Sequence, residues 1–142
     1  MKMTVPFARV SGILAVGLLA TVMAYALGQP LLDVRAATVV VNSASDADDG
    51  SCDPGHCSLR EAINATNAGA SEDVIVFDIP QSDPGFATSS SVWIIQPSSP
   101  LPPVTDTLVI DGYTQSGASA NTSPVSAGID AVLKIRLDGA LA

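Results

Sequence analysis

The sequence is poor in positive charge, aromatic side chains and cysteine. Its 142 residues contain 6 Lys and Arg against 14 Asp and Glu, which gives a net charge of −8. This balance argues against nucleic acid or an anionic membrane surface as a partner, because both are bound through basic patches. Aromatic residues make up 4% of the chain, too few for a row of exposed rings that stack on a glycan.

Motifs of common enzyme families are also missing. The sequence contains no Walker loop, no dinucleotide fingerprint, no zinc-protease motif and no G-x-S-x-G nucleophile motif. Arg60 and Glu61 could be interpreted as a catalytic pair, but no nucleophile, second carboxylate or metal motif accompanies them. We therefore predict no catalytic residues and no enzymatic activity in this segment.

Residues 1–28 have the pattern of a secretory signal peptide. Lys2 and Arg9 precede an uncharged apolar run at residues 11–27. This run ends in small residues suited to cleavage by a signal peptidase. A retained membrane anchor is the alternative, although the run lies at the short limit of about 17–25 residues for a span. We expect a secreted or cell-surface protein. Cleavage would change the net charge from −8 to −10, since this segment has two basic residues and no acid.

Short runs rich in Val and Ile, separated by turn residues, predict a mainly β protein. They cover residues 38–41, 74–77, 92–95, 107–110 and 132–137. Most are unbroken apolar runs, which suit strands buried on both faces. A βαβ fold would need helical crossovers between its parallel strands, and no helical pattern follows Gly69. A sandwich of hairpins and a β-solenoid remain, and the long connections without tight hairpin turns favour the solenoid.

One helix is predicted at residues 59–68. Ser58 and Glu61 have the spacing of a capping box, in which each side chain accepts a hydrogen bond from the backbone amide of the other. Apolar or small residues then recur at helical spacing, at Leu59, Ala62, Ile63 and Thr66. Gly69 supplies a stop. We expect this face to dock on the core.

The two cysteines, Cys52 and Cys57, lie just before this helix. In an exported chain we expect them to form a disulfide, because oxidising compartments favour the bridge. The alternative is a metal site made by Cys52, His56 and Cys57, but adjacent ligands are awkward for one tetrahedral ion and a fourth is not evident.

The loop before the helix is acidic. It carries Asp46, Asp48, Asp49 and Asp53, which could offer hard oxygen ligands to calcium. The spacing does not match an EF-hand loop, and a solvated surface loop is the simpler interpretation. We therefore predict no cofactor and no metal site, with calcium at this loop as the alternative.

Residues 57–62, Cys-Ser-Leu-Arg-Glu-Ala, resemble the CSLREA motif near the N-terminus of large secreted bacterial proteins with right-handed parallel β-helix, pectin-lyase-like repeats. Residues 111–122 and 133–139 are similar to further parts of those proteins, although Ser116 and Ala120 stand where prolines are usual. The resemblance implies the start of a right-handed parallel β-helix, with the helix covering its open end. It divides the chain into a signal peptide (1–28), a linker (29–37) and a cap with the first rungs (38–142), incomplete at the C-terminus.

We therefore expect a structural or adhesion-type protein of the cell surface, whose partners are downstream β-helix repeats of the same chain and an extracellular glycan or surface ligand. The alternatives are the N-terminal part of a polysaccharide-degrading β-helix enzyme and a glycan-binding module. Lys134 and Arg136 could bind an acidic glycan or simply be solvated, and Trp93 could stack on a sugar or belong to the core. Leu133, Ile135 and Leu137 alternate with the two basic residues and are predicted to face inward.

Overall fold

The computed structural model describes residues 36–69 and 72–142. The predicted signal peptide and most of the predicted linker lie outside the described residues. The elements are β1 (Thr38–Val41), α2 (Leu59–Asn67), β2 (Asp73–Phe77), β3 (Phe86–Ala87), β4 (Val92–Ile95), β5 (Leu108–Asp111), the 3-10 turns η1 (Gly112–Thr114) and η2 (Val125–Ala127), and β6 (Ile135–Leu137). No helix in this part of the chain is long and apolar enough to cross a membrane.

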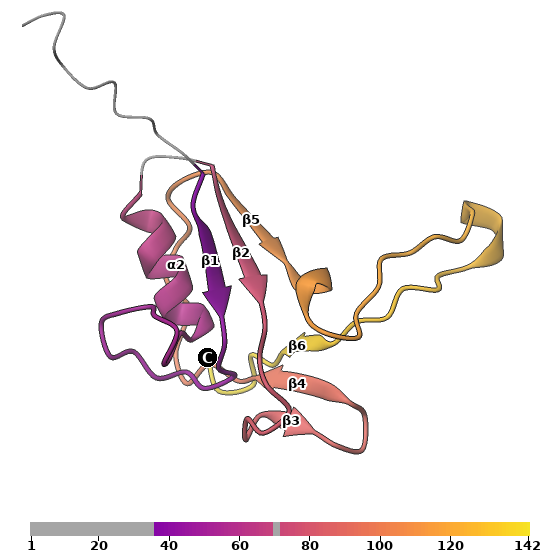
Figure 1. The fold of residues 1–142 in the computed structure, drawn as a ribbon, viewed down its shortest axis with the longest axis horizontal. Coiled ribbons are helices and arrows are strands. Elements are labelled where there is room, and N and C mark those ends of the chain that lie inside the picture. The colour runs from indigo at the N-terminus through magenta and orange to yellow at the C-terminus, as the bar shows by residue number, and fades with distance from the viewer. Residues whose placement is uncertain (1–35, 70–71) are drawn as a thin grey trace, which may run out of the picture. The chain divides into compact units, whose positions relative to one another are not determined.

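The first sheet is parallel and has the order β1-β2-β5 (Figure 1). Val39 lies beside Ile75, which in turn lies beside Ile110. In the central strand β2 the buried positions alternate, at Asp73, Ile75 and Phe77. The unbroken apolar run of β2 predicts burial on both faces. This prediction is wrong, because only one face of β2 packs fully on the core.

The second sheet has the order β3-β4-β6. β3 and β4 form an antiparallel hairpin, whereas β4 and β6 are parallel. Gly85 enters this hairpin where space is short: a Cβ at this position would lie 2.4 Å from the Ala44 Cβ and 2.9 Å from the Ile94 carbonyl oxygen. A glycine therefore lets the chain pass close to the β4 backbone.

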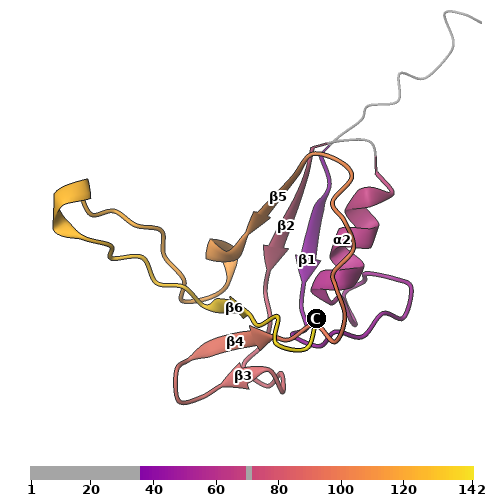
Figure 2. The same cartoon turned by 180° about the vertical axis from the view of Figure 1, so that it is seen from behind.

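The core is built from side chains of α2, of both sheets and of the segments between them. Its buried side chains are Val41, Ala44, Cys57, Leu59, Ala62, Ile63, Ile75, Phe77, Ile79, Trp93 and Ile95. Helix α2 contacts β1 and β2, and it lies along β1 in both views (Figures 1 and 2). Its buried residues include Leu59, Ala62, Ile63 and Thr66, so the helix face indicated by the sequence periodicity is the face that packs inward.

The expected right-handed parallel β-helix is wrong for the described residues. They form a small mixed fold of two separate three-stranded sheets and one α-helix, with no solenoid. The hairpin of β3 and β4 is one reason, because it turns the chain back where a solenoid coil would continue forward. Residues 112–134 are another, since they hold the 3-10 turns η1 and η2 and no strand.

The last predicted run, 132–137, also differs from expectation. Only Ile135–Leu137 is a strand, and Leu133 and Leu137 are exposed while Ile135 is partly buried. Apolar and basic residues therefore alternate along this segment, but the apolar side chains are not buried in the core.

Candidate functional site

The disulfide of Cys52 and Cys57 closes the end of the acidic loop. Asn42, at the end of β1, holds the bridge in place. Its side-chain Oδ1 accepts from the Cys57 backbone amide at 2.7 Å, and its backbone amide donates to the Cys57 carbonyl at 3.1 Å. Because both sulfurs are in the bridge, the alternative metal site of Cys52, His56 and Cys57 is wrong. The loop is instead fixed covalently to the start of α2.

Both hydrogen bonds of the capping box are present at the N-terminus of α2. Ser58 has extended backbone angles, and its Oγ accepts from the Glu61 amide at 3.2 Å. The Ser58 amide donates to the Glu61 Oε2 at 2.8 Å. These bonds satisfy two of the backbone groups that a helix end leaves without partners.

Glu61 makes further contacts that sequence reasoning missed. Its Oε1 accepts from the Asp49 amide at 2.7 Å, which ties the middle of the acidic loop to the helix. Its Oε2 lies 3.1 Å from the Nδ1 of His56. The residue is only 2% exposed, so this carboxylate acts in a dry environment where each hydrogen bond is strong. The capping-box spacing indicated Glu61 as a cap, but no local pattern indicates the contact with Asp49.

His56 completes a cluster of three potential metal ligands. One ligand atom each of Asp49, His56 and Glu61 lies within 4.8 Å of the others. The His56 Nε2 lies 2.9 Å from the Ser45 Oγ, whereas its Nδ1 is buried and has no hydrogen-bond partner among the described residues. The Glu61 carboxylate lies 3.1 Å from this nitrogen but is not aligned with it for a hydrogen bond. The three residues could therefore hold a metal ion.

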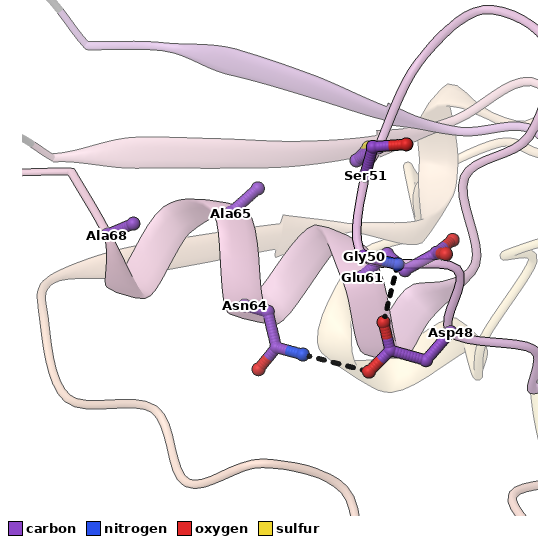
Figure 3. Close-up of a pocket in the computed structure, with 8 residues that line it drawn as sticks. Asp48, Gly50, Ser51, Glu61, Asn64, Ala65 and Ala68 are labelled. Atoms are coloured by element: carbon purple, nitrogen blue, oxygen red, sulfur yellow. Dashed lines mark hydrogen bonds between the residues drawn. The ribbon is translucent and has the colours of Figure 1, made fainter.

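The other three aspartates of the predicted calcium set do not join this cluster. Asp48 accepts from the Gly50 amide at 3.1 Å and from the Asn64 side chain at 3.4 Å (Figure 3). Asp53 accepts from the Gly55 amide at 2.7 Å. A pocket of about 230 Å³ lies between the loop and α2, with Asn64 on its helix side. The four aspartates mainly fix the shape of the loop through their hydrogen bonds. Of these four, only Asp49 belongs to the cluster with His56 and Glu61.

Asp46 links three segments of the chain. It accepts from the Arg60 Nε at 3.0 Å and from the Ser98 amide and hydroxyl at 2.8 and 2.7 Å. Burial raises the pKa of Asp46, but the hydrogen bonds from Ser98 and the guanidinium of Arg60 lower it more, so that the net pKa lies below the ordinary value. Arg60 also donates to the carbonyls of Ser99 and Pro100. Arg60 is thus a structural partner of the loop, which accounts for its charge without catalysis.

The glycan candidates lie apart from this site. Trp93 is buried, its ring lies tilted against that of Phe86, and its indole nitrogen donates to the Pro80 carbonyl at 2.9 Å, so the core interpretation agrees with the structure. The Lys134 Nζ donates to the Ser91 carbonyl at 3.1 Å, and the more exposed Arg136 lies 3.9 Å from Asp138.

Sequence reasoning also missed a buried glutamine. The side-chain amide of Gln115 accepts from the Ile79 amide and donates to the Ile79 carbonyl, both at 2.9 Å. It therefore mimics a strand neighbour for Ile79, beyond the end of β2. The run Asp-Gly-Tyr-Thr-Gln at 111–115 carried the resemblance, but nothing in the sequence assigns this role to its glutamine.

Comparison of the chain with protein-family models, with curated proteins and with solved structures finds no match.

Proposed function

We propose that the chain is a structural, adhesion-type protein of the cell exterior, and that the site at α2 holds its described part together. The observation that carries the second part of this proposal is the buried carboxylate of Glu61, which accepts hydrogen bonds from the amides of Ser58 and Asp49 and faces His56. Each oxygen of the carboxylate accepts one backbone amide, so Glu61 fastens the loop to the helix.

Three features support a location outside the cytoplasm. Disulfides such as Cys52–Cys57 persist in oxidising compartments. Residues 1–28 have the charge-then-apolar pattern of an export signal. Residues 57–62 resemble a motif of secreted bacterial proteins.

Export is tested by expressing the full chain in a bacterial host and measuring intact masses outside the cytoplasm, with and without reductant and an alkylating agent. We expect loss of the N-terminal segment near residue 28 and no alkylation before reduction. Full-length material retained in the cytoplasm with two free thiols would contradict the proposal.

The structural role of Glu61 is tested by Glu61→Gln, which keeps the size of the side chain but replaces one acceptor oxygen by a donor. The substitution leaves a buried amide facing another donor, and we expect a loss of about 1–3 kcal/mol in the free energy of unfolding. The matched control is Glu72→Gln, since Glu72 is exposed. Equal stabilities of the two variants in urea denaturation would show that Glu61 does not fasten the loop.

We propose, as a second function of the same site, that Asp49, His56 and Glu61 bind a divalent cation. The specific observation is the buried Nδ1 of His56, which has no hydrogen-bond partner among the described residues and faces two carboxylates. An imidazole nitrogen with carboxylate oxygens suits zinc. Calcium, the ion expected from the acidic loop, takes about 6–8 oxygen ligands and fits this set less well.

Cation binding is tested by thermal melts and calorimetric titration with zinc chloride and with calcium chloride. A ligand that binds only the folded state at 100 times its Kd stabilises it by about 2.7 kcal/mol, so we expect the midpoint to rise with zinc. His56→Gln should abolish the rise, while Asp106→Asn, on a remote exposed loop, should not. An unchanged wild-type midpoint with both ions would contradict the cation site.

A further inference from the structure

The two halves of the Cys52–Cys57 disulfide differ in their exposure to solvent. Cys57 is 0% exposed and belongs to the core, whereas Cys52 is partly exposed and only packs against the core. A thiol that opens a disulfide must reach one of its two sulfurs. In the folded protein, the sulfur that an external thiol can reach is therefore that of Cys52.

Cys52 also lines two hollows of the surface. One is the pocket of about 230 Å³ between the acidic loop and α2 (Figure 3). The other, of about 360 Å³, is lined by Cys52, Ala65 and residues 38–40, among others. Cys57 is not among the described residues that line either hollow. Both hollows thus offer a small molecule a path to Cys52 and none to Cys57.

The position of Cys57 suits it to be the sulfur that leaves when the bridge opens. Cys57 directly precedes Ser58, the N-cap of α2, and the N-terminus of a helix favours negative charge. Disulfide exchange places negative charge on the departing sulfur. The two hydrogen bonds between Cys57 and Asn42 involve only the backbone of Cys57, so they do not depend on the bridge.

We propose that the Cys52–Cys57 disulfide exchanges with external thiols in the folded protein, and that the thiol attacks at Cys52. The incoming thiolate forms a new S–S bond with the Cys52 Sγ, and the bond between Cys52 and Cys57 breaks. Its electron pair leaves on the Cys57 Sγ, which takes a proton from water. A second thiolate then displaces Cys52 in the same way. The external thiol is oxidised to its own disulfide, and the protein is reduced to two free thiols.

The carboxylates around Cys52 select the charge of the partner. Asp48 and Glu61 line the first hollow and Asp53 lines the second, and the described residues that line them include no lysine or arginine. A thiol on an anionic molecule is repelled by these groups, whereas a thiol beside a positive charge is attracted. The partner that fits this site is therefore a thiol carried next to a cationic group.

The rate of bridge opening in the full wild-type chain tests exchange in the folded state. The protein is incubated with cysteamine, quenched by alkylation in denaturant, and its free thiols are counted by intact mass. We expect opening at a rate that low concentrations of urea leave unchanged, because the reacting sulfur is already accessible. A bridge that stays closed, or a rate that rises with urea in step with the unfolded fraction, would overturn the proposal.

Single-cysteine variants test the assignment to Cys52. Cys57→Ser retains the thiol of Cys52 and Cys52→Ser retains that of Cys57, and circular dichroism establishes whether each variant is folded. With cystamine, the disulfide of cysteamine, we expect Cys57→Ser to form the mixed disulfide faster than Cys52→Ser, because Cys57 is buried. Faster reaction at Cys57, or equal rates in two folded variants, would overturn the assignment.

Salt dependence tests the charge of the partner. As ionic strength rises, we expect opening of the wild-type bridge by cysteamine, which carries an ammonium group, to slow down. Opening by mercaptoethanesulfonate, which carries a sulfonate, should become faster. Asp48→Asn should weaken both trends, whereas Asp106→Asn, which changes a residue outside both hollows, should preserve them. Rates that do not depend on salt for either thiol would refute the selection by charge.

Discussion

At the scale of single residues, Gly85 is the position where packing is tightest around a missing side chain. A Cβ there would meet the Ala44 Cβ and the Ile94 carbonyl oxygen at 2.4 and 2.9 Å, and neither is the flexible end of a long side chain. We expect Gly85→Ala to destabilise the protein by about 1–3 kcal/mol, because overpacking forces the backbone to move. Chemical denaturation measures the loss. Gly112→Ala is the matched control, since no atom lies within 4 Å of a Cβ there, and an equal loss in both variants would refute the steric account.

Asp130, in the loop between β5 and β6, has a carboxyl pKa well below its ordinary value. Hydrogen bonds from the hydroxyl and amide of Thr122, and from the Ser123 amide, lower the pKa of this exposed carboxyl to about 2. A lowered folded pKa means that the contribution of Asp130 to stability is complete above the ordinary pKa of 3.8 and disappears as the pH falls through about 2.

We therefore expect the carboxyl carbon of Asp130 to titrate near pH 2 in an NMR experiment, together with the amide signals of Thr122 and Ser123. The loop closure should persist at pH 4 and be lost below the folded pKa. Titration of Asp130 at its ordinary value would show that these hydrogen bonds do not hold the loop in solution.

At the scale of elements, the attachment of α2 depends on one apolar face. Ile63 is buried in the core, whereas the adjacent Asn64 is exposed. Ile63→Asp would bury a charge without a partner, and we expect it to lower the free energy of unfolding by several kcal/mol. Ala65→Asp adds the same charge at an exposed position of α2 and should cost much less. Thermal melts compare them, and equal midpoints would mean that the helix does not dock on the core.

Local patterns made α2 predictable from the sequence. Ser58 and Glu61 lie three residues apart, so their reciprocal bonds follow from spacing alone. The bridge of Cys52 and Cys57 follows from their isolation and proximity. In these cases the partners are close along the chain, and the physical interaction leaves a short-range signature.

Features that depend on distant partners were not predictable. β3 is two residues long and carries no strand signal, and the turn that follows it uses Ser91 with a φ of 54°, where a glycine would have indicated the turn. Gln115 bonds to Ile79 across 36 positions, a contact that no periodicity reveals. The parallel solenoid was inferred from long connections, but hairpin formation by β3 and β4 depends on this short and unmarked segment.

At the scale of the whole molecule, both sheets and the helix share one core. Val41 and Ile75 come from the first sheet, Trp93 and Ile95 from the second, and Ile63 from α2. The described residues belong to a single compact unit. Neither sheet can lose its packing without exposing part of the other, so we expect one cooperative unfolding transition and not a separate transition for each sheet.

This cooperativity makes the disulfide a global stabiliser. The bridge of Cys52 and Cys57 closes a short loop, and the chain-entropy model gives about 2 kcal/mol for a loop of this length. For a domain of about 100 residues, each kcal/mol shifts the midpoint by about 4–8 °C. We therefore expect a reductant to lower the single thermal midpoint by about 8–16 °C, as measured by calorimetry. The variant Cys52→Ala/Cys57→Ala should melt lower and be insensitive to reductant, which separates the bridge from other effects of the reagent. If the reductant splits the melt into two transitions, the shared core is not a single cooperative unit; if it leaves the wild-type midpoint unchanged, the bridge does not stabilise the fold.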